Sequence, residues 1–132
     1  MKDYYFTIKN EEIYELIVKK SRFIATIKQV DSIDAANHEI NSIKKIYKDA
    51  SHNTYAYIIR DNVNYMKYSD DKEPQGTAGL PILDVLKNNN LENVLIVVTR
   101  YFGGTLLGAG GLVRAYKNTA SNVLKKAGIV KI

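Results

Sequence analysis

The stretch of this sequence best suited to chemistry is glycine-rich and lies between two arginines. Five glycines separate Arg100 from Arg114, and an apolar run from Val94 to Thr99 precedes them. This order predicts a buried strand, a glycine loop and then a helix, whose free N–H groups and dipole favour anions. Arginine adds a planar fork that matches phosphate or carboxylate. We therefore predict an anion- or partner-binding site, made by Arg100, Gly103, Gly104, Gly110, Gly111 and Arg114.

The spacing of these glycines excludes two known nucleotide-binding motifs. No Lys-Ser/Thr pair follows them, as a Walker A loop requires, and Val113 stands where a dinucleotide fingerprint needs its third glycine. The alternative that stays open is structural, because glycines also allow a tight turn and close packing of a helix on a sheet.

An acidic segment forms the second candidate, with Asp70, Asp71 and Glu73 close together before Pro74. Carboxylates at this spacing repel one another unless solvent, a cation or basic groups intervene. Three roles stay open: a solvated surface loop, internal ion pairs with the arginines, or a divalent cation held by oxygen ligands. We expect at least one of these carboxylates to share a surface with the two arginines and the glycine loop.

His52 is the one candidate catalytic residue, as a base or a ligand beside the acidic segment. A hydrogen-bonded structural role is the alternative. The other histidine, His38, lies in a predicted helix, and no H-E-x-x-H spacing occurs. The sequence contains no cysteine, which excludes thiolate catalysis, disulfides and iron–sulfur clusters. We expect no bound transition metal and no cofactor.

Basic side chains support an anionic partner. Of the 19 Lys and Arg residues against 14 Asp and Glu, six follow Glu92, where no acid occurs. Segregated positive charge favours nucleic acid or phosphate, although it also suits a solvated helix face. Lys20 and Arg22, in a predicted hairpin turn, would extend the basic surface if they lie near the glycine loop. Ten tyrosines offer stacking for single-stranded nucleic acid, but core packing also explains most of them.

Hydrophobic periodicity predicts the elements that position these residues. Two strands are expected around 13–18 and 23–27, and an amphipathic helix follows the start signal at Asp31-Ser32. A hairpin over 54–60 and 63–68 is expected to turn tightly at Asp61-Asn62. A short helix over 78–87 and a central strand over 94–99 follow. The last element is a helix over 110–127, which has Leu112, Tyr116 and Ala120 on its apolar stripe and stops at Gly128.

This order favours an α+β fold, a two-layer α/β sandwich with one mixed sheet and helices mainly on one face. The 132 residues suit one compact domain, with 45% hydrophobic and 25% charged residues. The sequence lacks a signal peptide and an apolar run that would span a bilayer, so we expect a cytoplasmic protein that does not enter membranes. The oligomeric state is left open.

Four motifs together resemble the YigZ/IMPACT family, in the family's order and spacing, over residues 12–128. They are Lys19-Lys20-Ser21-Arg22-Phe23-Ile24-Ala25, Ala50-Ser51-His52-Asn53-Thr54-Tyr55-Ala56-Tyr57, the segment from Ser69 to Gly79, and Arg100-Tyr101-Phe102-Gly103-Gly104 with Gly110-Gly111-Leu112-Val113-Arg114-Ala115-Tyr116. Two positions depart from the family pattern. Lys72 replaces a glycine, and Thr54 replaces a cysteine, so the second position needs no thiol here.

The resemblance implies a fold similar to domain 2 of ribosomal protein S5. Eukaryotic IMPACT proteins regulate translation by competing for the activator of the amino-acid-starvation kinase, and bacterial members have been associated with nucleic acid or labelled proline dipeptidases. Bacterial relatives also continue into a ferredoxin-like second domain. We therefore expect residues 1–132 to form a single IMPACT N-terminal-like domain without that second domain.

Three functional hypotheses follow. The first is a non-enzymatic binding module linked to translation or RNA, which takes a phosphate-bearing partner such as RNA at the glycine junction. The second is a metal-assisted hydrolase or phosphoryl-handling enzyme that uses His52 and the segment from Asp70 to Glu73. The third is a protein–protein regulatory module of the starvation response, with a ribosome-associated protein as partner.

Overall fold

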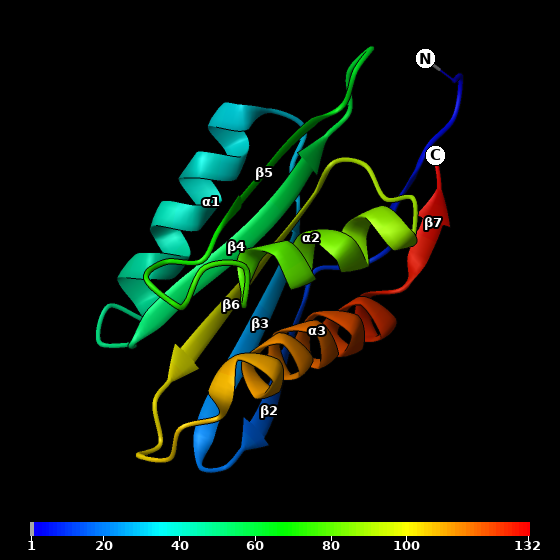
Figure 1. The fold of residues 1–132 in the computed structure, drawn as a ribbon. Coiled ribbons are helices and arrows are strands. Elements are labelled where there is room, and N and C mark those ends of the chain that lie inside the picture. The colour runs from blue at the N-terminus through cyan, green and yellow to red at the C-terminus, as the bar shows by residue number, and fades with distance from the viewer. Residues whose placement is uncertain (1) are drawn as a thin grey trace.

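A computed structural model describes residues 2–132 as two antiparallel sheets and three helices (Figure 1). In chain order the elements are β1 (Phe6–Ile8), β2 (Glu12–Val18), β3 (Ser21–Gln29), α1 (Ile33–Ile46), β4 (His52–Ile59), β5 (Tyr65–Ser69), α2 (Gly79–Asn88), β6 (Val94–Tyr101), α3 (Gly108–Ala127) and β7 (Ile129–Lys131).

The main sheet has the strand order β2-β3-β6-β4-β5. The run over 94–99 does form the central strand, as predicted, and every residue from Val94 to Arg100 is buried. The mixed sheet that we expected is instead antiparallel throughout. The reason lies in the helical connections. Helix α1 connects β3 to β4, and these two strands do run parallel. They are not neighbours, because β6 lies between them and pairs with both in the antiparallel sense.

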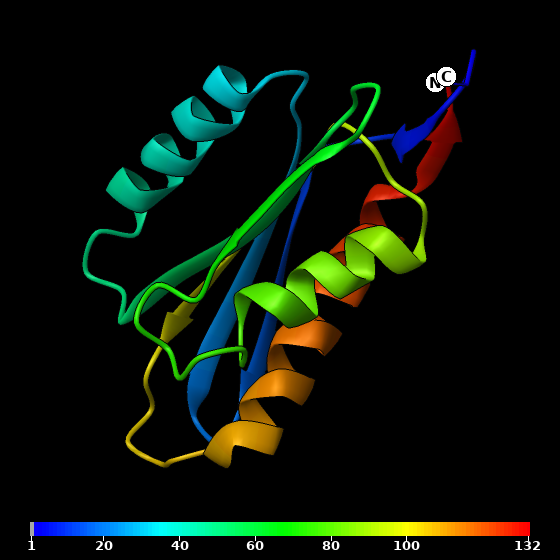
Figure 2. The same ribbon diagram turned by 45° about the horizontal axis from the view of Figure 1, so that its top comes forward.

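Helices cover both faces of this sheet (Figure 2). The larger core lies between the sheet and α2 with α3, where Ile82, Leu86 and Tyr116 are fully buried. A smaller core lies under α1, which packs Ala36 and Ile40 against the other face. The α+β sandwich is thus confirmed, two of the three helices share one face as predicted, and α1 adds a layer on the opposite face.

Local sequence signals explain where the helices begin and end. The Ser32 hydroxyl accepts a hydrogen bond from the N–H of Ala35 and caps α1. Pro81 lies in the first turn of α2, where backbone N–H groups have no intrahelical acceptor, so the missing N–H of proline costs no helical hydrogen bond. Gly128 ends α3 with φ +76°, a conformation that favours glycine.

Two features differ from the sequence expectations. The hairpin does not turn tightly at Asp61-Asn62, because Ile59 pairs with Tyr65 and residues 60–64 form the loop. The N–H of Arg60 donates to the Asn93 side chain at 2.9 Å, which holds the loop open. The small β1–β7 sheet was not predicted, since its strands are too short to show a period and lie at opposite ends of the sequence.

Candidate functional site

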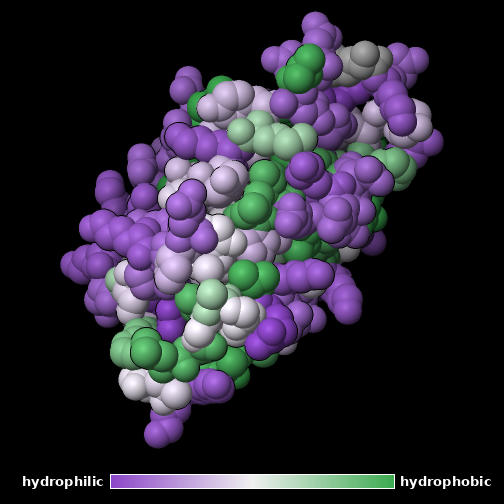
Figure 3. All heavy atoms as spheres, viewed as in Figure 1, coloured by the Kyte–Doolittle hydropathy of each residue, from purple (hydrophilic) through white to green (hydrophobic). Residues whose placement is uncertain are grey.

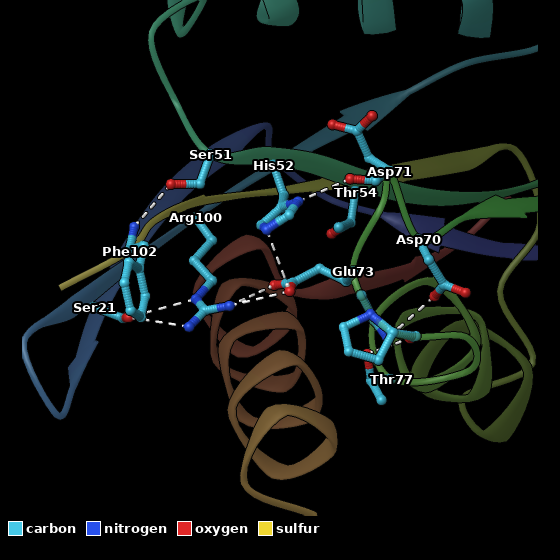
Figure 4. A network of polar contacts seen from close by, with 12 residues as sticks. Ser21, Ser51, His52, Thr54, Asp70, Asp71, Glu73, Thr77, Arg100 and Phe102 are labelled. Carbon is cyan, nitrogen blue, oxygen red and sulfur yellow. Dashed lines mark hydrogen bonds and ion pairs between the residues drawn. The ribbon is translucent and has the colours of Figure 1, made fainter. Parts of the chain in front are cut away.

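The glycine loop and the acidic segment meet through a buried ion pair between Arg100 and Glu73 (Figure 4). Arg100 is the last residue but one of β6, while Glu73 lies on the loop between β5 and α2. One guanidinium nitrogen of Arg100 lies 3.0 and 2.9 Å from the two Glu73 oxygens. Only 6% and 2% of the respective side chains are exposed. A charge buried this deeply persists only when an opposite charge compensates it, so each residue requires the other.

Two further side chains complete the surroundings of Glu73. The Tyr116 hydroxyl, from α3, donates to its carboxylate. Burial, together with the negative charge of Glu73, raises the pKa of Tyr116 far above its usual value, so that the phenol keeps its proton. The His52 ring uses both nitrogens: Nδ1 donates to the Asp71 carbonyl at 2.8 Å, and Nε2 lies 3.3 Å from Glu73. Both ring nitrogens of His52 therefore face groups of the fold, as the structural alternative requires.

Ser21 joins this buried network to the glycine loop. Its hydroxyl accepts hydrogen bonds from the Arg100 guanidinium at 3.3 and 3.4 Å and from the Gly103 N–H at 3.2 Å. Gly103 lies so close to the β2–β3 turn that a Cβ atom there would come within 3.0 Å of the Lys20 backbone. The loop can approach the turn only because position 103 has no side chain. Lys20 thus lies beside the glycine loop, a proximity that the sequence left open.

The two remaining carboxylates of the acidic segment also bind within the fold. Asp70 accepts hydrogen bonds from the N–H groups of Ala78 and Gly79 and so caps α2. Asp71 accepts the Asn53 N–H of β4 at 2.6 Å. Of the three roles considered, the internal ion pair with an arginine is observed for Glu73, whereas Asp70 and Asp71 accept backbone N–H groups. No cluster of three metal-ligating side chains occurs within residues 2–132.

The departure at Lys72 has a visible consequence. Asp71 and Lys72 adopt φ values of +42° and +71°, in the left-handed region that glycine favours. The loop therefore keeps the conformation that a glycine would adopt without strain, although lysine stands there. Thr54, the other departure, is fully buried and donates to the Val98 carbonyl at 2.8 Å, so it stabilises the strands.

The predicted anion-binding residues separate into an interior and a surface group. We expected Arg100 on the shared surface, but its side chain is buried in the interior, where Glu73 compensates its charge. Arg22 is exposed, but its guanidinium binds the Glu15 carboxylate at 3.0 and 3.2 Å and lowers the pKa of that carboxyl. Lys20 and Arg114 are exposed, and within residues 2–132 neither makes an ion pair or a side-chain hydrogen bond. Gly104 and Gly110 are exposed, Gly111 is half-buried, and the Arg114 guanidinium lies close to Gly110.

Three members of this arrangement are not evident from the sequence. Tyr116 falls on the apolar stripe of α3, and nothing in the sequence signals that its hydroxyl has a buried carboxylate partner. Ser21 and Ser51 occur in the recognised motifs, but a serine alone does not indicate which groups it binds. Ser51 accepts the Phe102 N–H at 3.0 Å and so fixes the start of the glycine loop.

Comparison with known proteins then decides the family. Residues 19–124 match the family model described as the Impact N-terminal domain. The chain belongs to the IMPACT family. IMPACT family member YvyE of Bacillus subtilis is 46% identical over 127 residues, which cover 96% of this chain and 58% of YvyE. YigZ of Escherichia coli is 39% identical, over 83% of this chain and 54% of YigZ.

Solved structures support the fold. A crystal structure of a hypothetical protein aligns with a TM-score of 0.94 and 32% identity, and it covers 100% of this chain and 65% of that protein. The two-domain translational regulator Yih1 aligns with a TM-score of 0.55 and 24% identity, over 93% of this chain and 47% of Yih1, a likeness of fold alone. The IMPACT domain described here thus spans little more than half the length of YvyE and YigZ. No helix within residues 2–132 is long and apolar enough to cross a bilayer.

Proposed function

We propose that this IMPACT domain is a non-enzymatic binding module linked to translation, and that it takes a phosphate-bearing partner, RNA, at the exposed side of its glycine junction. Family membership supports the link to translation, because the eukaryotic IMPACT proteins that this chain resembles regulate translation.

The observation that carries the proposal is the unbalanced positive charge beside the glycine loop. Arg114 and Lys20 are exposed cations without a partner in residues 2–132, and no acid follows Glu92 in the sequence. The acidic segment does not neutralise them, because its three carboxylates bind Arg100, α2 and β4. The first turn of α3 carries no acid and no side-chain cap, so its N–H groups add to the positive potential.

The same geometry gives the hydrolase hypothesis little support. Its base, His52, has both ring nitrogens engaged, and its carboxylates lie in separate structural contacts. A binding surface needs none of these groups to be free. We therefore place the function at the exposed cations and not at the buried network.

Replacing Arg114 with alanine is expected to weaken RNA binding by about 1.5–3 kcal/mol, because a charge-assisted contact to phosphate is lost. The slope of log K against log salt should become shallower by about one unit for the lost phosphate contact. Affinity measured across a salt series for the wild type and the variant gives both quantities. Since Arg114 is exposed, the free energy of unfolding should change by no more than about 0.5 kcal/mol.

Lys45→Ala is the matched control, since Lys45 is an exposed cation on α1, across the sheet from α3. It should change neither the affinity nor the salt slope beyond a small general effect. Equal losses for Arg114→Ala and Lys45→Ala would contradict a localised site and indicate unspecific attraction by net charge.

A further inference from the structure

Phe102 presents one face of its ring to solvent and has the other face held in place. The residue is 49% exposed. The guanidinium carbon of Arg100 lies 5.5 Å from the ring centroid, and Figure 4 shows the ring beside that side chain. Arg100 is itself fixed by Glu73 and Ser21, while the Phe102 N–H is bound to Ser51. The Phe102 backbone and the guanidinium beside the ring are therefore both held by contacts within the fold.

The surroundings of this ring combine apolar surface with positive charge. Leu106, at the tip of the loop, is 81% exposed. In Figure 3, hydrophobic atoms gather at the end of the molecule where the glycine loop lies, next to strongly hydrophilic ones. Lys20 lies beside the loop through the Gly103 contact, and Arg114 points back along α3 toward Gly110. The loop that carries the Phe102 ring and Leu106 is thus flanked by the turn that carries Lys20 and by the helix that carries Arg114.

The cation beneath the ring affects what the ring can bind. A guanidinium already placed against one face draws on the negative charge of the π system, so the outer face attracts a second cation less. A flat, neutral, polarisable partner suits that face better, and a nucleobase is such a partner. The bordering cations then suit the phosphates that accompany the base.

Two other anionic partners fit this surface less well. A duplex keeps the faces of its bases stacked inside, so an exposed ring gains no contact with them. An acidic peptide anchors best where a pocket buries its apolar side chain. Two hollows of the surface, one lined by residues 2–6, 58–66 and 87–92 and the other by residues 11–13, 26–28 and 126, lie away from Phe102. A protruding ring is instead the platform that single strands use.

We propose that Phe102 is a base-stacking platform for single-stranded RNA, with Lys20 and Arg114 placed to take the neighbouring phosphates. This inference rests on the proposed function, since it names the partner of the same surface. It adds that recognition depends on an unpaired base as well as on phosphate charge.

The test compares Phe102→Leu, which keeps an apolar side chain but loses the aromatic face, with Phe102→Tyr, which keeps it. Binding is measured to a single-stranded RNA of about ten nucleotides, to a duplex RNA, to inorganic polyphosphate and to an acidic peptide with one aromatic residue. Phe102→Leu should bind the single strand about tenfold more weakly. This fold-change lies at the lower end of the affinity lost when one base stack is removed. Phe102→Tyr should bind it as the wild type does, and neither variant should change polyphosphate binding.

Melting curves establish that both variants are folded. If Phe102→Leu binds single-stranded RNA as tightly as the wild type, or if the duplex binds as tightly as the single strand, the platform is refuted while the phosphate site stands. If the acidic peptide binds and single-stranded RNA does not, the surface is a protein-docking site and the inference is wrong. If neither RNA nor polyphosphate binds the wild type, the proposed function fails as well.

Discussion

Replacing Glu73 with alanine is expected to lower the free energy of unfolding by about 3–5 kcal/mol, because the variant leaves the Arg100 cation buried without its partner. Glu73 also accepts the Tyr116 hydroxyl and lies against His52, so β4, β6 and α3 lose a shared anchor at once. A loss of this size is a large part of the roughly 5–15 kcal/mol that stabilises a domain. Urea denaturation of the wild type and the variant measures it.

Two further variants separate the ion pair from ordinary packing. Glu11→Ala removes an exposed carboxylate that pairs with Lys28 at 3.4 Å, and it should cost less than about 1 kcal/mol. Combining Glu73→Leu with Arg100→Met removes both charges, and this double variant should be more stable than Glu73→Ala alone. If Glu73→Ala cost no more than Glu11→Ala, or the double variant were less stable than the single one, the buried pair would not have the role assigned here. The double variant keeps the test decisive even where the single one does not fold.

Gly103→Ala is expected to destabilise the domain by about 3 kcal/mol, at the upper end of what overpacking costs. The new methyl group would come within 3.0 Å of the Lys20 backbone, which cannot rotate away as a side chain would. The β2–β3 turn and the glycine loop would have to separate, and the hydrogen bond from Gly103 to Ser21 would be lost. Because Lys20 would move away from the loop, RNA affinity should fall too. Thermal unfolding and the RNA titration measure the two effects.

Gly110→Ala is the matched control for this prediction. A Cβ atom at Gly110 would have its nearest neighbour at 3.4 Å, the flexible end of the Arg114 side chain. Alanine favours a helix over glycine by roughly 0.5–1 kcal/mol, so this variant should be as stable as the wild type or slightly more stable. Should Gly103→Ala unfold at the same temperature as Gly110→Ala, the close approach of loop and turn would not be needed.

Much of the fold was predictable because hydrophobic periodicity is a local signal. The stripe of Leu112, Tyr116 and Ala120 predicted α3, and the continuous apolar run after Val94 predicted a strand buried on both faces. Strand direction depended on a pairing that periodicity does not encode. The insertion of β6 between β3 and β4 joins segments distant in sequence, so the antiparallel sheet could not be inferred from the order of elements.

The candidate site was predictable in its residues and less so in its arrangement. The glycines, Arg100 and the acidic segment were identified as belonging together, and Arg100 and Glu73 do meet. Whether an arginine at a strand end points into the interior or to solvent depends on what packs above it, here Glu73 from a distant loop. The sequence therefore placed Arg100 and Arg114 on one surface, although only Arg114 is exposed.

Partner binding is proposed to occur at the exposed side of the glycine junction. Amide chemical shifts, recorded while single-stranded RNA is added to the isotope-labelled domain, test it most directly. We predict that the shifted amides cluster at Lys20, Phe102, Gly104 and the start of α3 up to Arg114. Shifts confined to α1 or to the β1–β7 sheet, with the glycine junction unchanged, would contradict the account.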